Sequence, residues 1–435
     1  SFLPAATTMS TLWSVSSCRR SLQCLHRYPS YHVKRTLRVK ADVVNRPIFG
    51  CTSHSRTIQT KSINKGSLSH QAIEKVCILG SGNFGSAMST IIGKNASSLP
   101  FVDSQVNMWV YEEDFGNRKL SEIINTEHEN RKYLPGYKLP ENVVACPDLG
   151  TACKDATLLV FVLPHSFLPH LLDNIRNVVG PSCRGVSLIK GMDFDPVQKR
   201  PIRLSQMIEK GMGRDFQCGV MMGANVAKEV AAGQLCESTL ATRFKSPDLD
   251  EQTRLIFHRD ESFRVQHSYD VAGAEACGAL KNIYALGAGF VDGAGLGGNT
   301  KASLLRVGLH EMKQFCRTFF HGVEDSTFTE SCGVADLITT CYGGRNRLCA
   351  EEFAKRKHLM GAIDSDSCHA LWNQIEEELL KGQKLQGTHT TLDAYAAIEN
   401  ENALRDFPLL KTIYGIAFDS QPVKTIVDGI RVTNR

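Results

Sequence analysis

Residues 75–85 read Lys-Val-Cys-Ile-Leu-Gly-Ser-Gly-Asn-Phe-Gly. The apolar run that ends at Leu79 is typical of a buried parallel strand. Three glycines follow it at the spacing Gly-x-Gly-x-x-Gly, and the small and apolar residues at 86–92 suit a helix. In such a unit the first glycine allows a tight turn, the second lets a pyrophosphate approach the backbone, and the third lets the helix pack on the strand. The stretch therefore predicts a dinucleotide-binding turn.

Further apolar runs alternate with helical segments such as 168–179. Strands are expected in four of them, at 106–111, 157–163, 185–189 and 218–222. Alternating strands and helices are typical of a parallel sheet that is covered on both faces.

The pattern changes near residue 270. Long helical stretches follow, at 271–286, 301–320, 347–357 and 370–381. We expect an α/β fold in which a Rossmann-type parallel-sheet domain at 71–269 binds NAD. An all-α C-terminal domain at 270–435 would serve substrate binding and dimerisation. A folded part of 365 residues also exceeds the ~250–300 residues at which one core usually divides.

The charge of the chain is unevenly distributed. The 435 residues include 50 Lys+Arg and 45 Asp+Glu, a net charge of +5. Residues 1–70 hold eleven basic residues and one acidic residue, a net +10, which leaves the rest with 39 basic and 44 acidic residues, a net −5. Because the excess of cations lies in this extension, the folded part is not expected to bind nucleic acid.

The extension at 1–70 is rich in Ser, Thr and Arg and poor in acids, and we expect it to be disordered. This composition is typical of a mitochondrial transit peptide, and translated leader sequence is an equal alternative. A cytoplasmic protein is expected, or an organellar one if the transit peptide is genuine.

Two further classes of protein fit the sequence poorly. The longest apolar run, around 158–163, is far shorter than the ~18–20 residues that span a bilayer. The fifteen cysteines form no Cys-x-x-Cys pair, so free thiols in a reducing compartment are expected rather than disulfides or a metal site.

The strand expected at 106–111 ends in Tyr111 and is followed by Glu112. An acid at this edge can bond a ribose 2′-hydroxyl and repel a 2′-phosphate. No arginine stands there, so NAD is predicted over NADP. The alternative interpretation of Glu112 is a solvated acid in a surface turn.

Several polar residues are candidates for the chemistry. Lys190 ends the strand at 185–189, and Asn225 follows the strand at 218–222, both at the edge where open α/β sheets bind ligands. Lys281 follows a run of small residues, and burial there could lower its pKa toward a value suited to proton transfer. Alternatively, a lone lysine is a surface residue that extends to solvent.

The later part of the chain adds an anion-binding pattern. Asp336 and Thr340 are four residues apart, on one helix face. Arg345 and Asn346 follow two glycines, where an arginine can hold a phosphate through two hydrogen bonds. The loop that contains Lys384 and Gln386 suits a lid. A small anionic carbonyl or alcohol substrate is expected.

The strings GSGNFGSA, INTEHENRKYLPG, SLIKG, MGAN, CGALKN, GVADLITTCYGGRNR and GQKLQG occur in this order between about residues 75 and 422. Together they resemble the eukaryotic NAD-dependent glycerol-3-phosphate dehydrogenases. The resemblance implies reversible reduction of dihydroxyacetone phosphate by NADH, and a homodimer.

The resemblance also implies a role for individual residues. It assigns catalysis to Lys281, Lys190 and Asp336, with Lys281 as the general acid and base. It assigns substrate binding to Lys190, Asn225, Thr340, Arg345 and Asn346. It assigns cofactor binding to Gly80, Ser81, Gly82, Asn83, Phe84, Gly85, Tyr111, Phe167, Lys190, Ala227, Arg345, Lys384 and Gln386.

The chain departs from the family pattern at three places within its folded part. Phe84 stands where a tryptophan is common, the stretch 355–373 is longer, and Gly387 is followed by Thr-His-Thr-Thr rather than a Pro-Glu pair. Two alternatives remain, namely another two-domain dehydrogenase and a catalytically weak relative that binds NAD to regulate a partner. Loss of Lys281 or Arg345 would favour the second alternative, and both are present.

Overall fold

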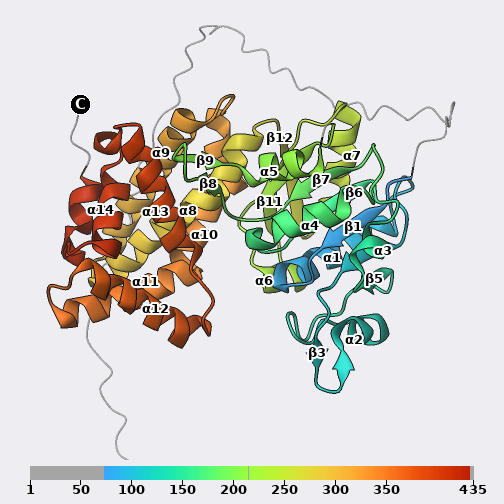
Figure 1. Ribbon diagram of the computed structural model, residues 1–435, viewed down its shortest axis with the longest axis horizontal. Helices are drawn as coiled ribbons and strands as arrows, with labels where there is room; N and C mark the ends of the chain where they lie inside the picture. The colour runs from blue at the N-terminus through green and yellow to red at the C-terminus, as the bar shows by residue number, and fades with distance from the viewer. Residues whose placement is uncertain (1–72, 214, 432–435) are drawn as a thin grey trace, which may run out of the picture. The chain divides into compact units, whose positions relative to one another are not determined.

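The computed structural model describes residues 73–213 and 215–431. The extension expected at 1–70 lies outside the described residues. Figure 1 shows a twisted sheet with helices on both faces, followed along the chain by a set of helices. The predicted α/β fold, with a Rossmann-type domain and a helical C-terminal region, is confirmed.

The main sheet has eight strands in the order β12-β11-β10-β7-β6-β1-β2-β5. Their bounds along the chain are β1 (Val76–Leu79), β2 (Val106–Trp109), β5 (Val143–Cys146), β6 (Leu158–Phe161), β7 (Arg184–Ser187), β10 (Cys218–Met222), β11 (Cys236–Ala241) and β12 (Phe263–Ser268). The five expected strands are all present. Two separate hairpins pair β3 (Asp114–Phe115) with β4 (Arg118–Lys119) and β8 (Asp193–Asp195) with β9 (Arg200–Ile202).

The sheet is not parallel throughout, because β11 runs antiparallel to β10. The connection between these strands contains only the short helix α6 (Ala227–Ala231), and an antiparallel neighbour does not need the long crossover that a parallel one requires. The strands β5, β11 and β12 were not predicted from the sequence. Both β5 and β12 show alternating burial. In β12 the exposed positions are polar, which interrupts the apolar run, whereas β5 is an apolar run of only four residues, Val-Val-Ala-Cys.

Both faces of the sheet are buried, and β1 shows why its sequence is apolar throughout. Val76 and Ile78 pack in one apolar cluster, while Cys77 and Leu79 pack in another. Successive side chains of a strand point to opposite faces, so a strand covered on both sides needs an apolar residue at every position.

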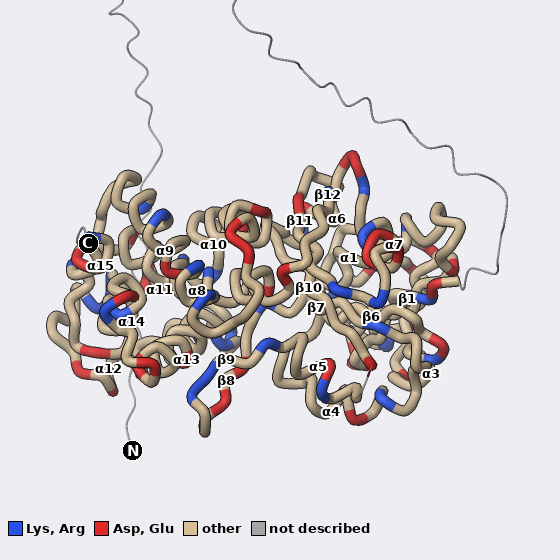
Figure 2. Tube along the Cα trace, turned by 90° about the horizontal axis from the view of Figure 1, so that it is seen from above, with Lys and Arg blue, Asp and Glu red and all other residues tan. Residues whose placement is uncertain are grey.

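Helices cover the two faces. The helices of the sheet domain are α1 (Asn83–Ala96), α2 (Leu120–Glu127), α3 (Leu149–Cys153), α4 (Leu168–Ile175), α5 (Leu204–Met212), α6 and α7 (Pro247–Phe257). Helix α1 contacts α6 and α7, and α4 contacts α3 and α5. Figure 2 shows acidic and basic residues interspersed along the described elements.

The helical region is built around α8 (Val271–Gly293), which is buried along most of its length. The other helices are α9 (Gly298–Phe319), α10 (Asp336–Gly343), α11 (Arg345–Met360), α12 (Ser365–Leu380), α13 (Gln386–Asn400), α14 (Pro408–Phe418) and α15 (Ile426–Ile430). A helix that is apolar all round is a core helix. Gly289 lets α11 approach closely, because a Cβ there would lie 2.3 Å from the carbonyl oxygen of Arg347.

The four expected helices are confirmed, and the structure extends each of them or shifts its ends. The stretch 355–373 spans the end of α11 and the first half of α12. It is packed by Trp372, whose ring stacks on Phe353 with the centroids 4.1 Å apart.

Candidate active site

Close backbone contacts determine where glycine is required in the turn at the end of β1. Gly80 has a φ of +121°, and a Cβ there would lie 2.2 Å from the carbonyl oxygen of Val162. A Cβ on Gly85 would lie 2.1 Å from the carbonyl oxygen of Gly80, so α1 packs against the turn itself. Gly82 differs, because a Cβ there would meet no atom within 4 Å. Two glycines thus serve the chain, and Gly82 borders open space at the start of α1, where a phosphate could approach the backbone.

A buried asparagine supports this turn from another part of the chain. Asn130 is fully buried, and its amide donates to the carbonyl oxygen of Ser81 at 2.7 Å and to Ser86 Oγ at 2.9 Å. Asn130 was not among the predicted site residues, although it lies within the string INTEHENRKYLPG. The neighbours of a single asparagine in the sequence do not indicate that it contacts a residue 49 positions away.

Two exposed aromatic residues follow strands of the sheet. Tyr111 comes after β2 and is 70% exposed, while Phe167 comes after β6 and is 56% exposed. Exposed rings near the glycine turn could contact the adenine or nicotinamide ring. Asn83 and Phe84 begin α1, and Ala227 begins α6, which packs against α1.

Glu112 has a hydrogen-bond partner within the protein. Its carboxylate accepts from the Ser121 amide at 3.2 Å and from Ser121 Oγ at 2.5 Å, so it caps the first turn of α2. The structure gives Glu112 a partner within the protein, and its bond to a ribose 2′-hydroxyl stays a prediction. The sequence could not reveal this contact, because the hairpin between Glu112 and Ser121 brings them together.

A charged centre joins the two regions of the chain. Asp336, at the start of α10, forms ion pairs with Lys281 of α8 and with Lys190, whose Nζ is 3.0 Å from Asp336 Oδ2. Lys190 Nζ also donates to the carbonyl oxygen of Gly223, after β10, at 2.8 Å. Lys281 is only 4% exposed and Asp336 only 2%. The three residues that were expected at the reacting centre therefore lie together, and two cations share one carboxylate.

Burial and the neighbouring charges act on Lys281 in opposite directions. Burial lowers the pKa of Lys281, Asp336 raises it and Lys190 lowers it, and the result is a pKa of about 7. Desolvation disfavours the charged amine, and a second cation adds repulsion. An amine with this pKa can both donate and accept a proton near neutral pH.

A cleft of about 550 Å³ lies beside this centre. Among its lining residues are Gly191, which follows Lys190, and four of the expected ligand-binding residues, namely Arg345, Asn346, Lys384 and Gln386. It is also lined by five residues that were not predicted as site residues, namely His165, Ser166, Asp193, His389 and Asp393. A residue in a cleft wall has no local sequence signal when the wall is assembled from several loops.

Arg345 and Asn346 begin α11, so the N-terminal end of a sixteen-residue helix faces the cleft. Arg345 Nη1 donates to Gln383 Oε1 at 3.0 Å. Asn346 donates to Asn282 Oδ1 at 2.9 Å and accepts from the Gly387 amide at 3.0 Å. Asn282 is the neighbour of Lys281, so this network ties the cleft to the buried lysine.

Three expected residues are placed less directly. Asn225 donates to the carbonyl oxygen of Glu237 at 2.9 Å and accepts from Ser238 Oγ at 3.1 Å, so its amide is bonded to β11. Thr340 lies one turn after Asp336, and its Oγ1 is 3.4 Å from Asp336 Oδ1. Lys384 Nζ bonds Glu376 Oε2 at 2.7 Å and Asn373 Oδ1 at 2.9 Å.

Three features are absent from the described residues, namely disulfides, clusters of metal-binding side chains and helices that could cross a membrane. The twelve cysteines among them all carry free thiols. Within 73–213 and 215–431, no group of three or more His, Cys, Asp or Glu residues is placed to hold a metal ion. No helix in the same ranges is long and apolar enough to cross a membrane.

A dinucleotide turn on a Rossmann-type sheet, a helical C-terminal region and a buried lysine with a lowered pKa define the class of NAD-dependent dehydrogenases. Residues 75–247 match the model of the NAD-dependent glycerol-3-phosphate dehydrogenase N-terminus, and residues 270–428 match that of its C-terminus.

Individual relatives agree with the family models. The chain is 48% identical over 358 residues to the glycerol-3-phosphate dehydrogenase 1-like protein of Xenopus tropicalis, covering 82% of this chain and 96% of that one. It is 46% identical over 353 residues to the cytoplasmic NAD(+) glycerol-3-phosphate dehydrogenase of Homo sapiens, covering 81% and 96%. The solved structure of glycerol-3-phosphate dehydrogenase from Saccharomyces cerevisiae superposes with a TM-score of 0.75 at 39% identity, covering 83% of this chain and all of that one. The chain therefore belongs to the NAD-dependent glycerol-3-phosphate dehydrogenase family.

Proposed function

We propose that the chain catalyses reversible hydride transfer between NADH and C2 of dihydroxyacetone phosphate, which gives sn-glycerol 3-phosphate. The observation that carries this proposal is the buried centre in which Lys281 and Lys190 share Asp336 beside a cleft lined by Arg345 and Asn346. The cleft offers a phosphate-binding helix end, and the centre offers a proton donor to a carbonyl oxygen.

Lys281 is the proton donor in this proposal. In the direction of reduction its ammonium gives a proton to the C2 oxygen as negative charge develops there, and in the reverse direction the neutral amine removes it. Its pKa of about 7 makes both forms available near neutral pH. Lys190 adds a second positive charge that stabilises the developing alkoxide, and Asp336 holds both amines in place.

The substrate phosphate is assigned to the start of α11. Arg345 offers a planar guanidinium, which matches phosphate oxygens through two hydrogen bonds. The first amides of α11 and its dipole add positive potential at the same end. Asn346 has one amide hydrogen left beside its bond to Asn282. Thr340 and Asn225 complete the proposed substrate contacts.

The residues of the glycine turn fit the dinucleotide. The bound nicotinamide would supply or accept the hydride. Gly82 leaves the approach to the backbone open, and Asn130 holds the turn in place. The other proposed contacts are Gly80, Ser81, Asn83, Phe84, Gly85, Tyr111, Phe167, Lys190, Ala227, Arg345, Lys384 and Gln386.

Organisation and location are part of the same proposal. The division into domains at 71–269 and 270–435 is supported by the end of β12 at Ser268 and the start of α8 at Val271. A homodimer is supported by Ile338 and Tyr342, which are exposed apolar residues four apart on α10. A cytoplasmic location is proposed from the human relative, with an organelle as the alternative if 1–70 is a transit peptide.

The decisive experiment measures NADH absorbance at 340 nm with dihydroxyacetone phosphate as the substrate. Loss of absorbance that depends on this substrate supports the proposal, and unphosphorylated dihydroxyacetone serves as the control. A chain that binds NADH but consumes none would instead be the regulatory relative. Equal rates with both ketones would point to another dehydrogenase.

A further inference from the structure

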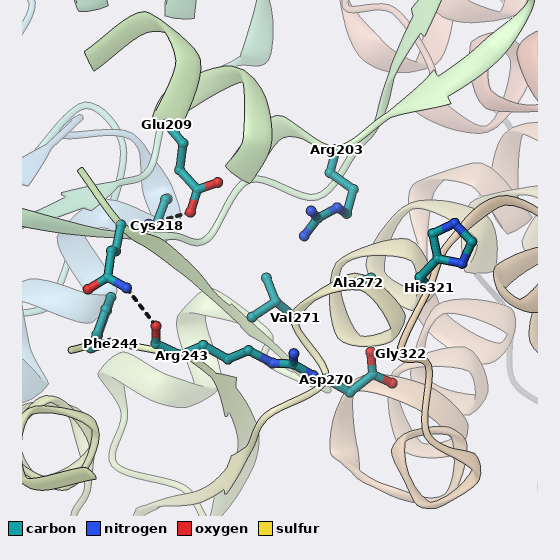
Figure 3. Close-up of a pocket in the computed structure, with 11 residues that line it drawn as sticks. Arg203, Glu209, Cys218, Arg243, Phe244, Asp270, Val271, Ala272, His321 and Gly322 are labelled. Carbon is teal, nitrogen blue, oxygen red and sulfur yellow. Dashed lines mark hydrogen bonds between the residues drawn. The ribbon is translucent and has the colours of Figure 1, made fainter. Parts of the chain in front are cut away.

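A second cavity lies away from the catalytic cleft. Its volume is about 200 Å³, which is room for several water molecules at ~30 Å³ each. Its walls come from the start of α5, the ends of β10 and β11, the first residues of α8 and the loop after α9. Figure 3 shows its lining residues, among them Arg203, Arg243 and His321.

This cavity lies at the amino-terminal end of β10, whereas the catalytic centre lies at the carboxyl-terminal end of the same strand. Cys218, the first residue of β10, lines the cavity, whereas Gly223, just past the other end of β10, accepts from Lys190. A five-residue strand is about 17 Å long, so the two sites are separated by the full height of the sheet. The cavity shares no lining residue with the cleft.

The cavity presents hydrogen-bond donors that have no acceptor. The Arg203 guanidinium forms no hydrogen bond or salt bridge with any described residue, and neither does the His321 ring. Arg243 uses only Nε, which donates to the carbonyl oxygen of Tyr269 at 2.6 Å. In Figure 3 the Arg203 side chain enters above Val271 and the Arg243 side chain runs below it. Two guanidinium groups around one small space are the usual means of binding an oxyanion.

Two carboxylates also line the cavity, and most of their oxygen atoms are already bonded. Asp270 is buried and caps α8 through the Gly273 amide at 2.7 Å, and its second oxygen accepts from the Glu324 amide and Thr327 Oγ1. Glu209 Oε1 accepts from the Cys218 amide at 3.0 Å. Both carboxylates keep a negative charge beside the two guanidinium groups, but their hydrogen bonds go to backbone amides and to Thr327, and Glu209 has only one free oxygen.

We propose that this cavity binds a small phosphate-type oxyanion between Arg203 and Arg243, and that binding there alters turnover at the catalytic centre. This is a second site, separate from the one that holds the substrate phosphate. The ligand is free phosphate or a small phosphate monoester, since the cavity is too small for a dinucleotide.

The route to the catalytic centre consists of two continuous elements. Helix α8 starts in the cavity at Val271 and carries Lys281 ten residues later, about 15 Å along the helix. Strand β10 starts there at Cys218 and leads to Gly223. An anion held by both arginines would link the segment before α5 to the loop after β11. Arg243 of that loop is bonded to the carbonyl oxygen of Tyr269, two residues before α8. Helix α8 is also bonded to α5 through Glu275, which accepts from Ser205. A small displacement of α8 would move the amine of Lys281.

Binding is tested on the full chain with the substitution Arg345→Ala, which removes the arginine expected to hold phosphate in the catalytic cleft. Inorganic phosphate is titrated at constant ionic strength while the thermal unfolding midpoint is measured. We expect a saturable rise. The double variant Arg203→Gln, Arg243→Gln should weaken the apparent affinity by about tenfold or more, because it removes charge-assisted hydrogen bonds.

Controls separate a specific site from general ion effects. Arg306→Gln removes an exposed arginine of α9 outside the cavity and should leave the titration unchanged. The single variant Arg203→Gln should show an intermediate affinity for phosphate. It replaces the double variant in the test if the double variant does not fold. Glycerol 2-phosphate replaces phosphate in a second series, and tighter binding of this monoester would identify a phosphorylated metabolite as the ligand. No saturable rise, or an equal rise in the parent and the Arg203→Gln variant, would overturn the proposed site.

Coupling is tested with Arg345 intact. At saturating dihydroxyacetone phosphate, competition in the cleft is removed, so any change in kcat on adding phosphate arises elsewhere. We expect kcat to change in the parent and to stay constant in the Arg203→Gln, Arg243→Gln variant. Binding without any change in kcat in the parent would overturn the proposed coupling and leave only the site. If the chain does not turn over this substrate at all, the binding titration still decides the site.

Discussion

The glycine turn and the lysine centre lie at the same edge of the sheet, yet they are built in opposite ways. The turn is one stretch of backbone, Gly80–Gly85, in which two glycines are required by close contacts within the fold. The centre is made of side chains, and Lys190 and Asp336 are 146 residues apart in the chain. A backbone site depends on the absence of side chains, whereas the centre depends on three charges being held at short range with little solvent.

The largest effect is expected from removing the amine of the centre. Lys281→Ala should lower kcat by roughly 10²–10⁴-fold, because it deletes the proton donor. Substrate-dependent NADH oxidation measures this directly.

A matched control for this variant is Lys357→Ala. Lys357 is also buried, but it donates to the carbonyl oxygens of Ile416 and Asp419 at the end of α14. Its loss should lower the free energy of unfolding and leave kcat unchanged. If Lys281→Ala keeps the parent kcat, the proton donor is a different group.

Arg345→Ala should act on the substrate rather than on the proton. We expect KM for dihydroxyacetone phosphate to rise by about 10²-fold, since a charge-assisted pair of hydrogen bonds is lost. The KM for NADH should change less. An unchanged KM for the phosphorylated ketone would place the phosphate elsewhere in the cleft.

The pH dependence of kcat/KM should follow the protonation of the buried Lys281 amine. Reduction needs protonated Lys281, so its kcat/KM should fall as pH rises through about 7, whereas oxidation needs the neutral amine and should fall as pH drops through about 7. Each pH unit beyond that point changes the rate about tenfold. In Lys190→Gln a cation that lowers this pKa is removed, so both limbs should move to higher pH. Limbs that stay in place would show that Lys281 does not control the profile.

The same shift has a consequence for stability. The pKa of Lys281 in the folded state is below that of the unfolded lysine, so the unfolded state binds more protons between about 7 and the usual value of 10.5. The contribution of Lys281 to the free energy of unfolding should therefore rise with pH across this window. Comparing urea unfolding of the parent and Lys281→Met at several pH values measures it.

The turn can be divided into glycines that serve the fold and one that serves the ligand. Gly80→Ala should lower the free energy of unfolding by about 1–3 kcal/mol or more, because its Cβ overlaps the Val162 carbonyl and its φ is positive. Gly82→Ala should leave stability almost unchanged and raise the KM for NADH. The proposed division of roles between Gly80 and Gly82 is contradicted if Gly82→Ala unfolds the chain while Gly80→Ala does not.

The smallest effect is expected at Asn130, whose side chain supports the backbone of the glycine turn. Asn130→Ala removes one of the two donors to the Ser81 carbonyl, the other being Ser86 Oγ at 3.1 Å, so it should cost only about 1 kcal/mol of stability. NADH binding should weaken with little change in kcat. Isothermal titration with NADH and urea unfolding measure the two consequences, and a selective loss of kcat would contradict this role.

Much of the fold could be predicted from the sequence because its signals are local. The apolar runs that became β1, β6 and β10 have no polar residue to expose, and they were found with small errors at their ends. Strand β12 was missed because alternating burial leaves polar residues in its sequence, Phe263–Ser268, whereas β5 was missed although all four of its residues, Val143–Cys146, are apolar. The contact of Glu112 with Ser121 was also not predicted, because a hairpin brings the two residues together and no local residue pattern indicated that hairpin.

The sequence by itself determined the dinucleotide turn, the change from strands to helices near residue 270, and the residue types of the centre. Those properties follow from side-chain volume, backbone freedom and periodicity, which act over a few neighbours. Only the tertiary structure decided that Lys190 and Lys281 share Asp336, that Asn130 holds the turn, and that Arg203 and Arg243 line a second cavity. The physical reason is that a pKa, an ion pair and a cavity depend on distance and burial, and the packing of α8 against β10 and α10 sets both.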